Sequence, residues 1–549
     1  MNPWWSNGIV YHLYIKSFFD FDQNGMGDLK GVTQKLDYLA QLGVDAIWLS
    51  PYFDSPMRDN GYDISDYLNV NPLFGSNADL DELFTEMKKR KMKIIIDLVL
   101  NHSSKDHVWF KKALNDPQSK YRNYYIFKDE SEINNARSIF GNSTWEPVGN
   151  KQYYYHTFAV EQPDLNWENP ELRQEIYDIV NFWLKKGVDG FRLDAITFIK
   201  KNPDFPRFEA DDEDGLFNCT KSSLNQVGIL DFLREFKEKT WGDRPIYTVG
   251  EAAGVSFEDL PNYISPKGIL TSIFDFSYTD IDISGDAWKL EFDWTYAEFQ
   301  RRLDIMQLNT QKTGMGVTYL ENHDNPRSLN KFFQKLTIDP KHHFSMASAL
   351  QMFFLFLRGT AYIYQGEELG MINVNFRSID EIEDLHTIDQ YERAIKKGMS
   401  EAEALRLVNK RSRDHSRVPV YWSKDQLAQT NRAKPYVKTH DDYGCDPVEV
   451  QTQDPYSVLN FMRTLIQIKK SEDMEAFLIN SEYVVNPSID GVISYKRVLD
   501  FKTLTLYINM TDSVKKVSGY KGQVFISNNN KKEFDGTLEA YESIILRSF

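Results

Sequence analysis

The sequence predicts an α/β fold: a (β/α)8 TIM barrel with an inserted subdomain after strand 3 and a C-terminal antiparallel β domain. Short apolar runs alternate with segments of helical spacing, and eight strand-like runs alternate in this way. Such alternation is typical of parallel strands covered by helices. A doubly wound sheet is the alternative, but the Gly-rich phosphate loop expected after its first strand is missing.

The elements of the barrel follow from short apolar runs and from apolar residues at helical spacing. Gly43 and Gly187 mark the ends of two helices. The expected strands are Ile9–Phe18, Asp45–Pro51, Lys93–Asn101, Val188–Asp194, Pro245–Glu251, Ile269–Phe276, Val317–His323 and Ala361–Gln365. The expected helices are Lys30–Leu42, Leu80–Arg90, Glu171–Lys186, Ile229–Lys239, Tyr296–Leu308 and Phe344–Leu357.

The predicted domains follow from changes in this pattern. Residues 1–102 and 170–472 form the barrel, which includes an irregular, charged excursion at 373–443. Residues 103–169 are rich in Tyr, Asn, Ser and Trp and form the inserted subdomain. Short alternating runs after a helix at Ser457–Lys470 predict a β-sandwich domain over 473–549.

Composition limits the partners. The chain has 549 residues, which is too long for one compact core. Its 64 basic and 80 acidic residues give a net charge of −16, which disfavours nucleic acid because phosphate binding needs a basic surface. The longest apolar run, Met352–Leu357, is far shorter than the roughly 20 residues of a membrane span. We expect a small neutral substrate and no membrane partner. The sequence makes no prediction about the oligomeric state.

The N-terminus and the cysteines favour a cytoplasmic protein. Met1–Ile15 lacks the basic start and the continuous apolar stretch of a signal peptide. Cys219 and Cys445 lack the spacing of metal ligands, so buried thiols in a reducing compartment are expected.

Three acidic residues end three strand-like runs. Asp194, Glu251 and Asp324 close the runs GFRLD, YTVGE and ENHD. A carboxylate at the end of an apolar strand is unfavourable unless it binds or reacts. A salt bridge explains any one of them alone. Three at the carboxyl ends of barrel strands indicate one pocket for acid–base and nucleophilic chemistry.

Hydrolysis of a glycosidic bond needs a proton donor at the leaving oxygen and a carboxylate at the anomeric carbon. Arg192 precedes Asp194 by two residues, so both side chains face one side of the strand. The guanidinium favours the ionised carboxylate and makes Asp194 the candidate nucleophile. Glu251 has no adjacent cation in the sequence and is the candidate proton donor. His323 and Asp324 are expected to hold sugar hydroxyls and to stabilise positive charge on the ring.

Five motifs together resemble a known family. The chain resembles an α-glucosidase of glycoside hydrolase family 13, the α-amylase family, from about Trp4 to at least Arg463, and is most similar to its oligo-1,6-glucosidase branch. The motifs are Asp97–His102 for the first family region, Gly190–Asp194 for the nucleophile, Val249–Glu251 for the acid/base, Asn322–Asp324 for the third carboxylate, and Gln162–Trp167 for the motif that marks the branch.

The resemblance implies a retaining mechanism. Asp194 forms a covalent β-glucosyl intermediate, and Glu251 protonates the departing oxygen and then deprotonates the incoming water. Asp324 stabilises the distorted ring. The retaining geometry places the carboxyl groups of Asp194 and Glu251 about 5–5.5 Å apart.

The resemblance also implies which residues hold the terminal glucose: Asp59, Tyr62, His102, Arg192, His323 and Arg413. The Asp59-Asn60-Gly61 run is also typical of a tight turn, and both interpretations hold together. A pair between Asp59 and Arg413 closes the pocket behind the non-reducing end and makes the enzyme exo-acting. Arg413 stands in RDHSR, which departs from the family's usual RDNAR.

A loop after the first strand has the spacing of a calcium site. Oxygen donors recur at alternate positions around a Gly turn, with one backbone carbonyl among them. The loop resembles the calcium loop of this glucosidase branch, and an Asx turn without an ion is the alternative. The expected ligands of a structural Ca²⁺ are Asp20, Asp22, Asn24, Met26 and Asp28. Asp97 and His102 lack the third ligand of a catalytic zinc.

Linkage preference stays open between α-1,6, α-1,4 and a broad range. In this branch Val after the nucleophile accompanies α-1,6 preference and a smaller Ala or Thr accompanies α-1,4 preference. Ala195 therefore conflicts with the Gln162–Trp167 motif, and one or two methyl groups shift specificity by only a few kcal/mol. The run after Glu251, AAG, lacks the usual Met-Pro and changes the wall near the leaving group.

The leading hypothesis is an exo-acting α-glucosidase on short isomalto- and malto-oligosaccharides. A transglucosylase or a sucrose isomerase uses the same intermediate, and the NHDNPR run is shared in form with sucrose isomerases. A trehalose-6-phosphate hydrolase needs a cationic aglycone site, which the sequence does not locate. A catalytically inactive amylase-like domain of a transporter subunit loses its acids and carries an anchor, whereas this chain retains Asp194, Glu251 and Asp324.

Overall fold

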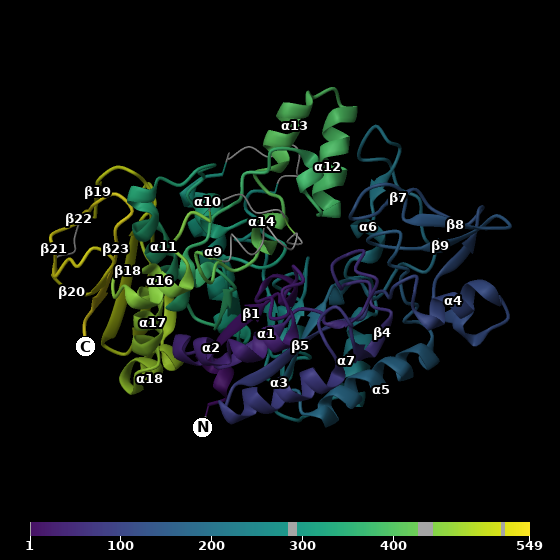
Figure 1. Ribbon diagram of the computed structural model, residues 1–549, viewed down its shortest axis with the longest axis horizontal. Coiled ribbons are helices and arrows are strands. Elements are labelled where there is room, and N and C mark those ends of the chain that lie inside the picture. The colour runs from purple at the N-terminus through teal and green to yellow at the C-terminus, as the bar shows by residue number, and fades with distance from the viewer. Residues whose placement is uncertain (1, 284–293, 426–436, 438–442, 518–521) are drawn as a thin grey trace. The chain divides into compact units, whose positions relative to one another are not determined.

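The largest sheet of the computed structural model contains eight strands, and the structure describes residues 2–283, 294–425, 437, 443–517 and 522–549 (Figure 1). The strand order is β13-β12-β10-β5-β2-β1-β15-β14. The pairs β1–β15, β5–β10, β10–β12, β12–β13 and β14–β15 run parallel. The strands are β1 (Ile9–Leu13), β2 (Ala46–Leu49), β5 (Lys93–Val99), β10 (Gly190–Asp194), β12 (Tyr247–Glu251), β13 (Ser272–Phe274), β14 (Val317–Thr318) and β15 (Thr360–Tyr364). The predicted (β/α)8 barrel is confirmed.

Helices follow the strands along the chain, as predicted. They are α1 (Leu29–Gln34), α2 (Leu36–Leu42), α3 (Asn77–Lys89), α5 (Pro170–Lys186), α7 (Ile229–Lys239), α9 (Tyr296–Thr313) and α11 (Pro340–Leu355). The bounds of α5 show how local chemistry sets an element. Asn169 accepts from the amide of Glu171, Pro170 occupies the first turn, and Gly187 ends the helix at φ 93°.

The core strands are buried on both faces, which explains why their runs are mostly apolar. All five residues of β1, β10 and β15 are buried. At Gly190, a Cβ would lie 2.6 Å from the carbonyl oxygen of Tyr247 on the neighbouring strand β12. A glycine is therefore required for the close approach of β10 and β12, the strands that carry Asp194 and Glu251.

Three predicted elements differ from the structure. The predicted strand Ile9–Phe18 ends at Leu13, and Ile15–Ser17 form a 3-10 turn, η2. The strand predicted at Val317–His323 has two residues, so Asp324 lies in a loop and not at a strand end. The predicted helix Lys30–Leu42 is interrupted at Lys35, between α1 and α2. The apolar side chains in these loops are buried, so burial alone produced a strand-like sequence signal.

The segment that follows β5 contains its own small sheets. Strands β6 (Phe127–Asp129), β9 (Gln152–Tyr155) and β8 (Trp145–Gly149) pair antiparallel, after helix α4 (Val108–Asn115). The short strand β7 (Ala136–Arg137) pairs with β11 (Phe217–Asn218). The inserted subdomain after strand 3 therefore has a defined structure, although its sequence has little periodicity.

The excursion at 373–443 is more regular than predicted. It contains α12 (Leu385–Lys396), α13 (Glu401–Val408) and α14 (Asp414–Arg417). Asp384 caps α12, and Ser400 and Glu403 form a capping box at α13. The high charge of this stretch hid these signals. Residues 426–436 and 438–442 of the excursion lie outside the described residues.

The C-terminal region forms the predicted antiparallel sheet. Its strand order is β16-β17-β18-β23-β20-β21. The strands are β16 (Glu482–Val485), β17 (Val492–Leu499), β18 (Lys502–Asn509), β23 (Ser543–Arg547), β20 (Gly522–Ser527) and β21 (Glu533–Phe534). Helix α17 (Val458–Lys469), predicted at Ser457–Lys470, and helix α18 (Glu472–Asn480) precede it.

The chain divides into two compact units, and each is described by itself. One contains residues 1–47, 90–92 and 275–549, and the other contains 48–89 and 93–274. The predicted domain boundaries stay a prediction. Among the described residues, no helix is both long enough and apolar enough to cross a membrane.

Candidate active site

One guanidinium connects three carboxylates in the unit that contains β5, β10 and β12. Arg192 Nη1 donates to Asp97 Oδ1 at 2.9 Å and to Asp194 Oδ1 at 2.5 Å. Arg192 Nη2 donates to Glu251 Oε2 at 2.7 Å. The side chain of Arg192 is 4% exposed and that of Glu251 is 25% exposed. We call Asp97, Arg192, Asp194 and Glu251 the Arg192 cluster.

The pairing of parallel strands brings the Arg192 cluster together. Arg192 on β10 lies opposite Asp97 on β5, in register. Leu193 lies opposite Gly250, so Asp194 and Glu251 end adjacent strands at the same edge. The period of two along β10 places Arg192 and Asp194 on one face, as the sequence predicted.

Burial determines the protonation of this cluster. It raises the pKa of Asp194 well above its usual range; Arg192 lowers that pKa, whereas the carboxylates of Glu251 and Asp97 raise it further. Burial likewise raises the pKa of Asp97 to about 6, against the opposing effect of Arg192. Arg192 favours the ionised form of Asp194, as expected, but burial and two further carboxylates act against it, because three carboxylates share one cation in a buried site.

The structure also corrects the expectation for Glu251. The sequence places no cation next to it, but Arg192 lies 59 positions earlier and contacts it directly. The backbone amide of Ala195 donates to the same Glu251 oxygen at 3.0 Å. Ala195 has φ 42° and ψ 35°, a left-handed conformation that is uncommon for a residue with a Cβ. The turn after β10 thus directs an amide at Glu251.

Asp59 and Tyr62 lie in a tight turn, as predicted. The amide of Tyr62 donates to the carbonyl of Asp59 at 2.9 Å, and Asn60 and Gly61 have φ of 53° and 102°. The Tyr62 hydroxyl donates to Asp97 Oδ2 at 3.1 Å. The turn therefore brings Tyr62 to the Arg192 cluster.

Gln162 joins two of the predicted sugar-binding residues and was not predicted among them. Its Nε2 donates to Asp59 Oδ2 at 2.9 Å and lies 3.1 Å from His102 Nε2. Gln162 is fully buried, and burial lowers the pKa of His102 to about 4. His102 is therefore neutral near pH 7. The sequence signal was the Gln162–Trp167 motif.

The rest of that motif anchors the loop that carries Gln162. Asp164 is fully buried, accepts from the amide of Thr157 at 2.8 Å and pairs with Lys201 at 2.5 Å. Trp167 Nε1 donates to the carbonyl of Leu100 at 2.8 Å. The motif thus fixes the loop beside the end of β5.

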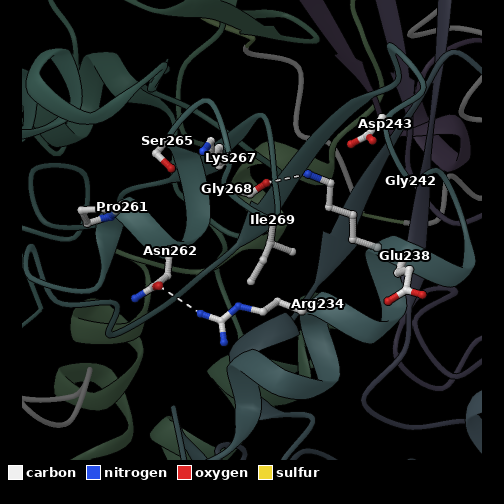
Figure 2. A pocket seen from close by; sticks show the side chains of 11 residues that line it. Arg234, Glu238, Gly242, Asp243, Pro261, Asn262, Ser265, Lys267, Gly268 and Ile269 are labelled. Atoms are coloured by element: carbon white, nitrogen blue, oxygen red, sulfur yellow. Dashed lines mark hydrogen bonds between the residues drawn. The ribbon is translucent and has the colours of Figure 1, made fainter.

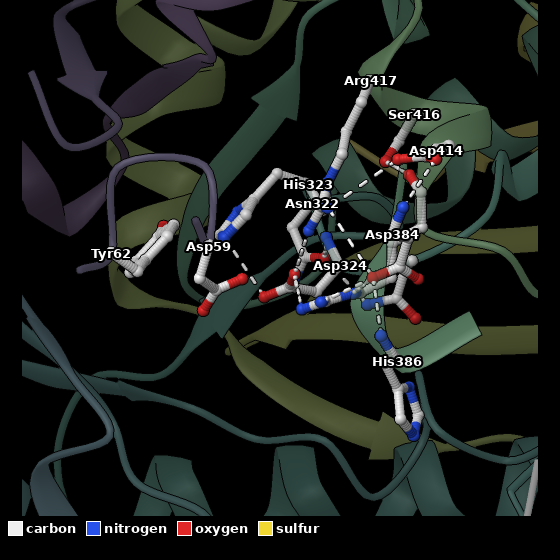
Figure 3. Close-up of polar contacts among 12 residues, drawn as sticks. Asp59, Tyr62, Asn322, His323, Asp324, Asp384, His386, Asp414, Ser416 and Arg417 are labelled. Carbon is white, nitrogen blue, oxygen red and sulfur yellow. Dashed lines mark hydrogen bonds and ion pairs between the residues drawn. The ribbon is translucent and has the colours of Figure 1, made fainter. Parts of the chain in front are cut away.

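A second group of charges surrounds Asp324 in the other unit. Asp324 Oδ1 accepts from Arg413 Nη1 at 2.9 Å. The same oxygen accepts from Arg417 Nη2 at 2.9 Å (Figure 3). His323 Nε2 lies 3.1 Å from Asp324 Oδ2, and Arg417 Nε donates to the carbonyl of His323 at 2.9 Å. Asp324 therefore has a fixed carboxylate whose side chain is still 31% exposed.

Asp384 completes this group, which we call the Asp324 cluster: Asp324, Asp384, Arg413 and Arg417. Arg413 Nε donates to Asp384 Oδ1 at 2.7 Å. Sequence reasoning missed Asp384 and Arg417. Arg417 ends the RDHSR run that carries Arg413, and Asp384 precedes the apolar residues of α12 as a helix cap does.

The predicted residues therefore form three groups. Asp194, Glu251, Arg192 and Tyr62 meet at the Arg192 cluster; Asp59 and His102 meet at Gln162 in the same unit; His323, Asp324 and Arg413 meet in the other unit. The convergence of all three acids and the Asp59–Arg413 pair span the two units and stay predictions.

The candidate calcium loop gathers three carboxylates. Oxygen atoms of Asp20, Asp22 and Asp28 lie within 4.8 Å of one another. Asp20 Oδ2 accepts from the amide of Gly25 at 2.8 Å, and Asn24 Oδ1 accepts from the amide of Met26 at 2.9 Å. Asp28 also caps α1 through the amide of Gly31. The donors are hard oxygens, the type that Ca²⁺ prefers, so they fit this ion.

One surface cavity is lined by none of the residues of these groups. It measures about 410 Å³ and is lined by residues of α7 and of the segment before β13 (Figure 2). Arg234 Nη2 donates to Asn262 Oδ1 at 3.1 Å (Figure 2). Lys237 Nζ donates to the carbonyl of Gly268 at 2.8 Å. These polar groups bind one another, and none of the predicted site residues lines the cavity.

Comparison with known proteins decides the family. A family profile described as "Alpha amylase, catalytic domain" matches residues 12–476. The chain belongs to the α-amylase family. The "Probable oligo-1,6-glucosidase 3" of Bacillus subtilis (strain 168) is 37% identical over 516 residues, which cover 92% of this chain and 91% of that protein.

Two solved structures resemble this α-amylase family member over its whole length. Bacillus licheniformis trehalose-6-phosphate hydrolase is 34% identical, covers 100% of both chains and gives a TM-score of 0.89. Isomaltulose synthase from Klebsiella sp. LX3 is 32% identical, covers 100% of this chain and 99% of its own, and gives a TM-score of 0.92. The predicted family is thus confirmed.

Proposed function

We propose that this chain is a retaining, exo-acting α-glucosidase that releases glucose from the non-reducing end of short α-glucosides. The observation that carries the proposal is the shared guanidinium. Arg192 binds the carboxylates of both Asp194 and Glu251 at the ends of adjacent strands, in a member of a glycosidase family. Two carboxylates beside one anomeric centre are what retaining hydrolysis requires.

In the first step, Asp194 attacks the anomeric carbon while Glu251 gives its proton to the leaving oxygen. The carboxylates of the Arg192 cluster outnumber its one cation, so a proton is retained there near neutral pH. Arg192 then stabilises the carboxylate that remains ionised. In the second step, Glu251 takes a proton from water as the water oxygen attacks the anomeric carbon, which breaks the bond to Asp194 and releases its carboxylate.

The remaining polar residues hold the sugar. Asp324 stabilises the charged ring, and the neutral His102 binds hydroxyls by hydrogen bonding and not by charge. Tyr62 packs beside Asp97, and Asp59 is oriented by Gln162. We propose that Asp59 and Arg413 close the pocket and restrict the enzyme to chain ends.

The substrates proposed are short isomalto- and malto-oligosaccharides, with a broad linkage range. The B. subtilis relative is named a probable oligo-1,6-glucosidase, and this name supports α-1,6 bonds as substrates of this chain. The small Ala195 beside Glu251 and the absence of Met-Pro after that acid leave room for other linkages. The comparison of kcat/KM across α-1,1, α-1,3, α-1,4 and α-1,6 glucosyl disaccharides tests this proposal.

Glucosyl transfer and hydrolysis of a phosphorylated disaccharide are the alternatives. They are supported by the likeness to an isomaltulose synthase and to a trehalose-6-phosphate hydrolase. Products from sucrose, maltose and isomaltose separate the first alternative, because only a transferring enzyme makes a new disaccharide. A kcat/KM for trehalose 6-phosphate that is at least tenfold above that for isomaltose would establish the second.

We also propose a structural calcium ion at the loop of residues 20–28. Asp20, Asp22 and Asp28 would supply carboxylate oxygens, and Asn24 and the carbonyl of Met26 would supply the others. The bound ion would neutralise three close carboxylates and fix the loop; it takes no part in the reaction. A cytoplasmic location is likewise our proposal: Cys219 and Cys445 form no disulfide.

Azide rescue tests the roles of the two acids. With p-nitrophenyl α-glucoside, Asp194→Ala should lose at least 10⁴-fold in kcat, and azide should restore turnover as β-glucosyl azide. Glu251→Ala should keep more activity on this good leaving group than on isomaltose, and azide should yield the α-anomer. Glu235→Ala, which removes an ion pair between α7 and Arg173, is the control without effect on kcat. The same anomer from both variants would reject the assignment.

A further inference from the structure

We propose that Asp384 is a positioning residue that holds Arg413 against the catalytic-site carboxylate Asp324. The inference rests on the proposed function, because it assigns a role to the group behind Asp324. Arg413 Nη1 donates to Asp324 at 2.9 Å, while Nε donates to Asp384 at 2.7 Å and Nη2 lies 2.6 Å from the same Asp384 oxygen. The edge of the guanidinium formed by Nε and Nη2 thus faces Asp384, and the third nitrogen, Nη1, donates to Asp324.

Asp384 is built as a fixed anchor. Its side chain is fully buried, and it accepts hydrogen bonds from the amides of His386 and Thr387 as the cap of α12. The hydroxyl of Thr387 donates to it as well. A carboxylate held by a helix start has no freedom to follow a moving arginine, so Arg413 must take the orientation that Asp384 imposes.

A second set of hydrogen bonds connects the backbone at Asp384 with the turn that carries Arg413. Asp414, next to Arg413, accepts from the amides of Glu383 and Asp384 at 2.7 and 3.0 Å. Two carboxylates therefore connect the start of α12 with the turn that carries Arg413. Asp384, at the start of α12, binds the side chain of Arg413, and Asp414, in the turn, binds the backbone at the start of α12. Figure 3 shows Asp384 and Asp414. Arg417 Nη1 also lies 3.8 Å from Asp384 while its Nη2 binds Asp324.

The charge of Asp384 is maintained at all working pH values. Burial opposes ionisation, but Arg413 and Arg417 hold the pKa of Asp384 well below its usual range. A neutral side chain at this position would keep the helix cap and lose the ion pair, because Asn and Ser cap helices about as well as Asp. The capping role and the positioning role can therefore be separated by substitution.

The test compares Asp384→Asn and Asp384→Ser with wild type on isomaltose and p-nitrophenyl α-glucoside. We expect kcat to fall about 10- to 100-fold on both substrates, with a melting temperature within about 3 °C of wild type. The matched control is Ser400→Ala, which removes the cap of α13 in the same excursion. It should lower the melting temperature similarly and leave kcat unchanged.

A double-mutant cycle with Arg413→Lys shows whether Asp384 acts through Arg413. Lys keeps the charge but cannot bind two carboxylates in the same planar geometry. We expect Asp384→Asn to reduce kcat less than threefold in the Arg413→Lys background, because the residue it positions is already lost. Multiplied effects of the two substitutions would overturn the proposal.

Other outcomes also overturn it. A kcat within twofold of wild type in both Asp384 variants excludes positioning. Failure of both variants to fold assigns Asp384 a structural role only. Failure of the proposed function is recognised separately: wild type would then release no glucose, or Asp324→Asn would keep full activity.

Discussion

Asp97 and Asp384 are both fully buried carboxylates paired with arginine, but their pKa values shift in opposite directions. Burial raises the pKa of Asp97 to about 6, against the effect of Arg192. The pKa of Asp384 is held well below its usual range in spite of burial, by Arg413 and Arg417. Asp97 shares one guanidinium with two other acids, whereas Asp384 contacts two guanidiniums and two backbone amides.

The opposite pKa shifts indicate different chemical roles for the two clusters. A cluster with too few cations retains a proton, as acid–base chemistry requires. A cluster with cations on both sides of each carboxylate keeps its charge and its geometry. We therefore assign proton transfer and nucleophilic attack to the Arg192 cluster, and charge stabilisation to the Asp324 cluster.

The largest effect is expected when the single cation of the Arg192 cluster is changed. Arg192→Lys keeps the charge, but one Nζ cannot bind three carboxylates that now contact two separate nitrogens. We expect kcat/KM for p-nitrophenyl α-glucoside to fall by about 10³-fold or more. Retention of more than a tenth of wild-type kcat/KM would show that charge alone suffices.

Arg137→Lys is the matched control for this substitution. Arg137 is also buried and binds two carboxylates, Asp211 and Asp214, in the same unit. Its replacement should lower the melting temperature without changing kcat/KM. An equal loss in both variants would assign the effect to stability.

A smaller effect is expected when one acid is removed from the Arg192 cluster. The Asp97 carboxylate raises the pKa of Asp194, so Asp97→Asn should move the acidic limb of the kcat/KM profile to lower pH. The kcat should fall about 10- to 100-fold, since Tyr62 and Trp48 lose an anionic acceptor. Asp304→Asn, which changes a carboxylate of α9, should leave the limb in place.

The direction of that limb is a strict test. Asp194 must be ionised to attack, and its raised pKa places the loss of activity above the pH expected for an ordinary aspartate, whose pKa is about 4. A limb that moves to higher pH in Asp97→Asn would contradict the electrostatics of the cluster.

The smallest effect is expected at the third acidic group, Asp20, Asp22 and Asp28. EDTA should lower the melting temperature by a few degrees, since a ligand that binds only the folded state stabilises it. The kcat at 25 °C should not change. Asp22→Asn should reduce the EDTA effect by at least half. A melting temperature that is the same with EDTA and with added Ca²⁺ would reject the site.

The fold was largely predictable because the barrel strands are buried on both faces. The residues of β5, β10, β12 and β15 are nearly all buried, so these runs are mostly apolar apart from the site residues and can be recognised directly. The turn at Ile15–Ser17 was not predictable, because its side chains are buried as deeply as those of β1. Helices α12 and α13 were missed because their charged faces obscured the caps at Asp384 and Ser400.

The sequence identified most residues of the site, but it did not show which charged side chains contact one another. Motif spacing identified Asp194 and Glu251, and the period of a strand related Arg192 to Asp194. It could not show that Arg192 also contacts Glu251, because that contact depends on the register of two strands whose paired residues lie 57 positions apart in the sequence. The roles of Gln162 and Asp384 depend on loops whose paths follow from tertiary packing.

Trapping of the covalent intermediate shows which carboxylate is the nucleophile. A 5-fluoro-glucosyl fluoride slows release of the glucosyl group more than its attachment, so the labelled residue is found by mass spectrometry of the digested protein. We expect one 5-fluoro-glucosyl adduct, on the peptide with Asp194, and α-glucose as the first product from an ordinary substrate by NMR. A label on Asp324 or Asp97, or first release of β-glucose, would contradict it.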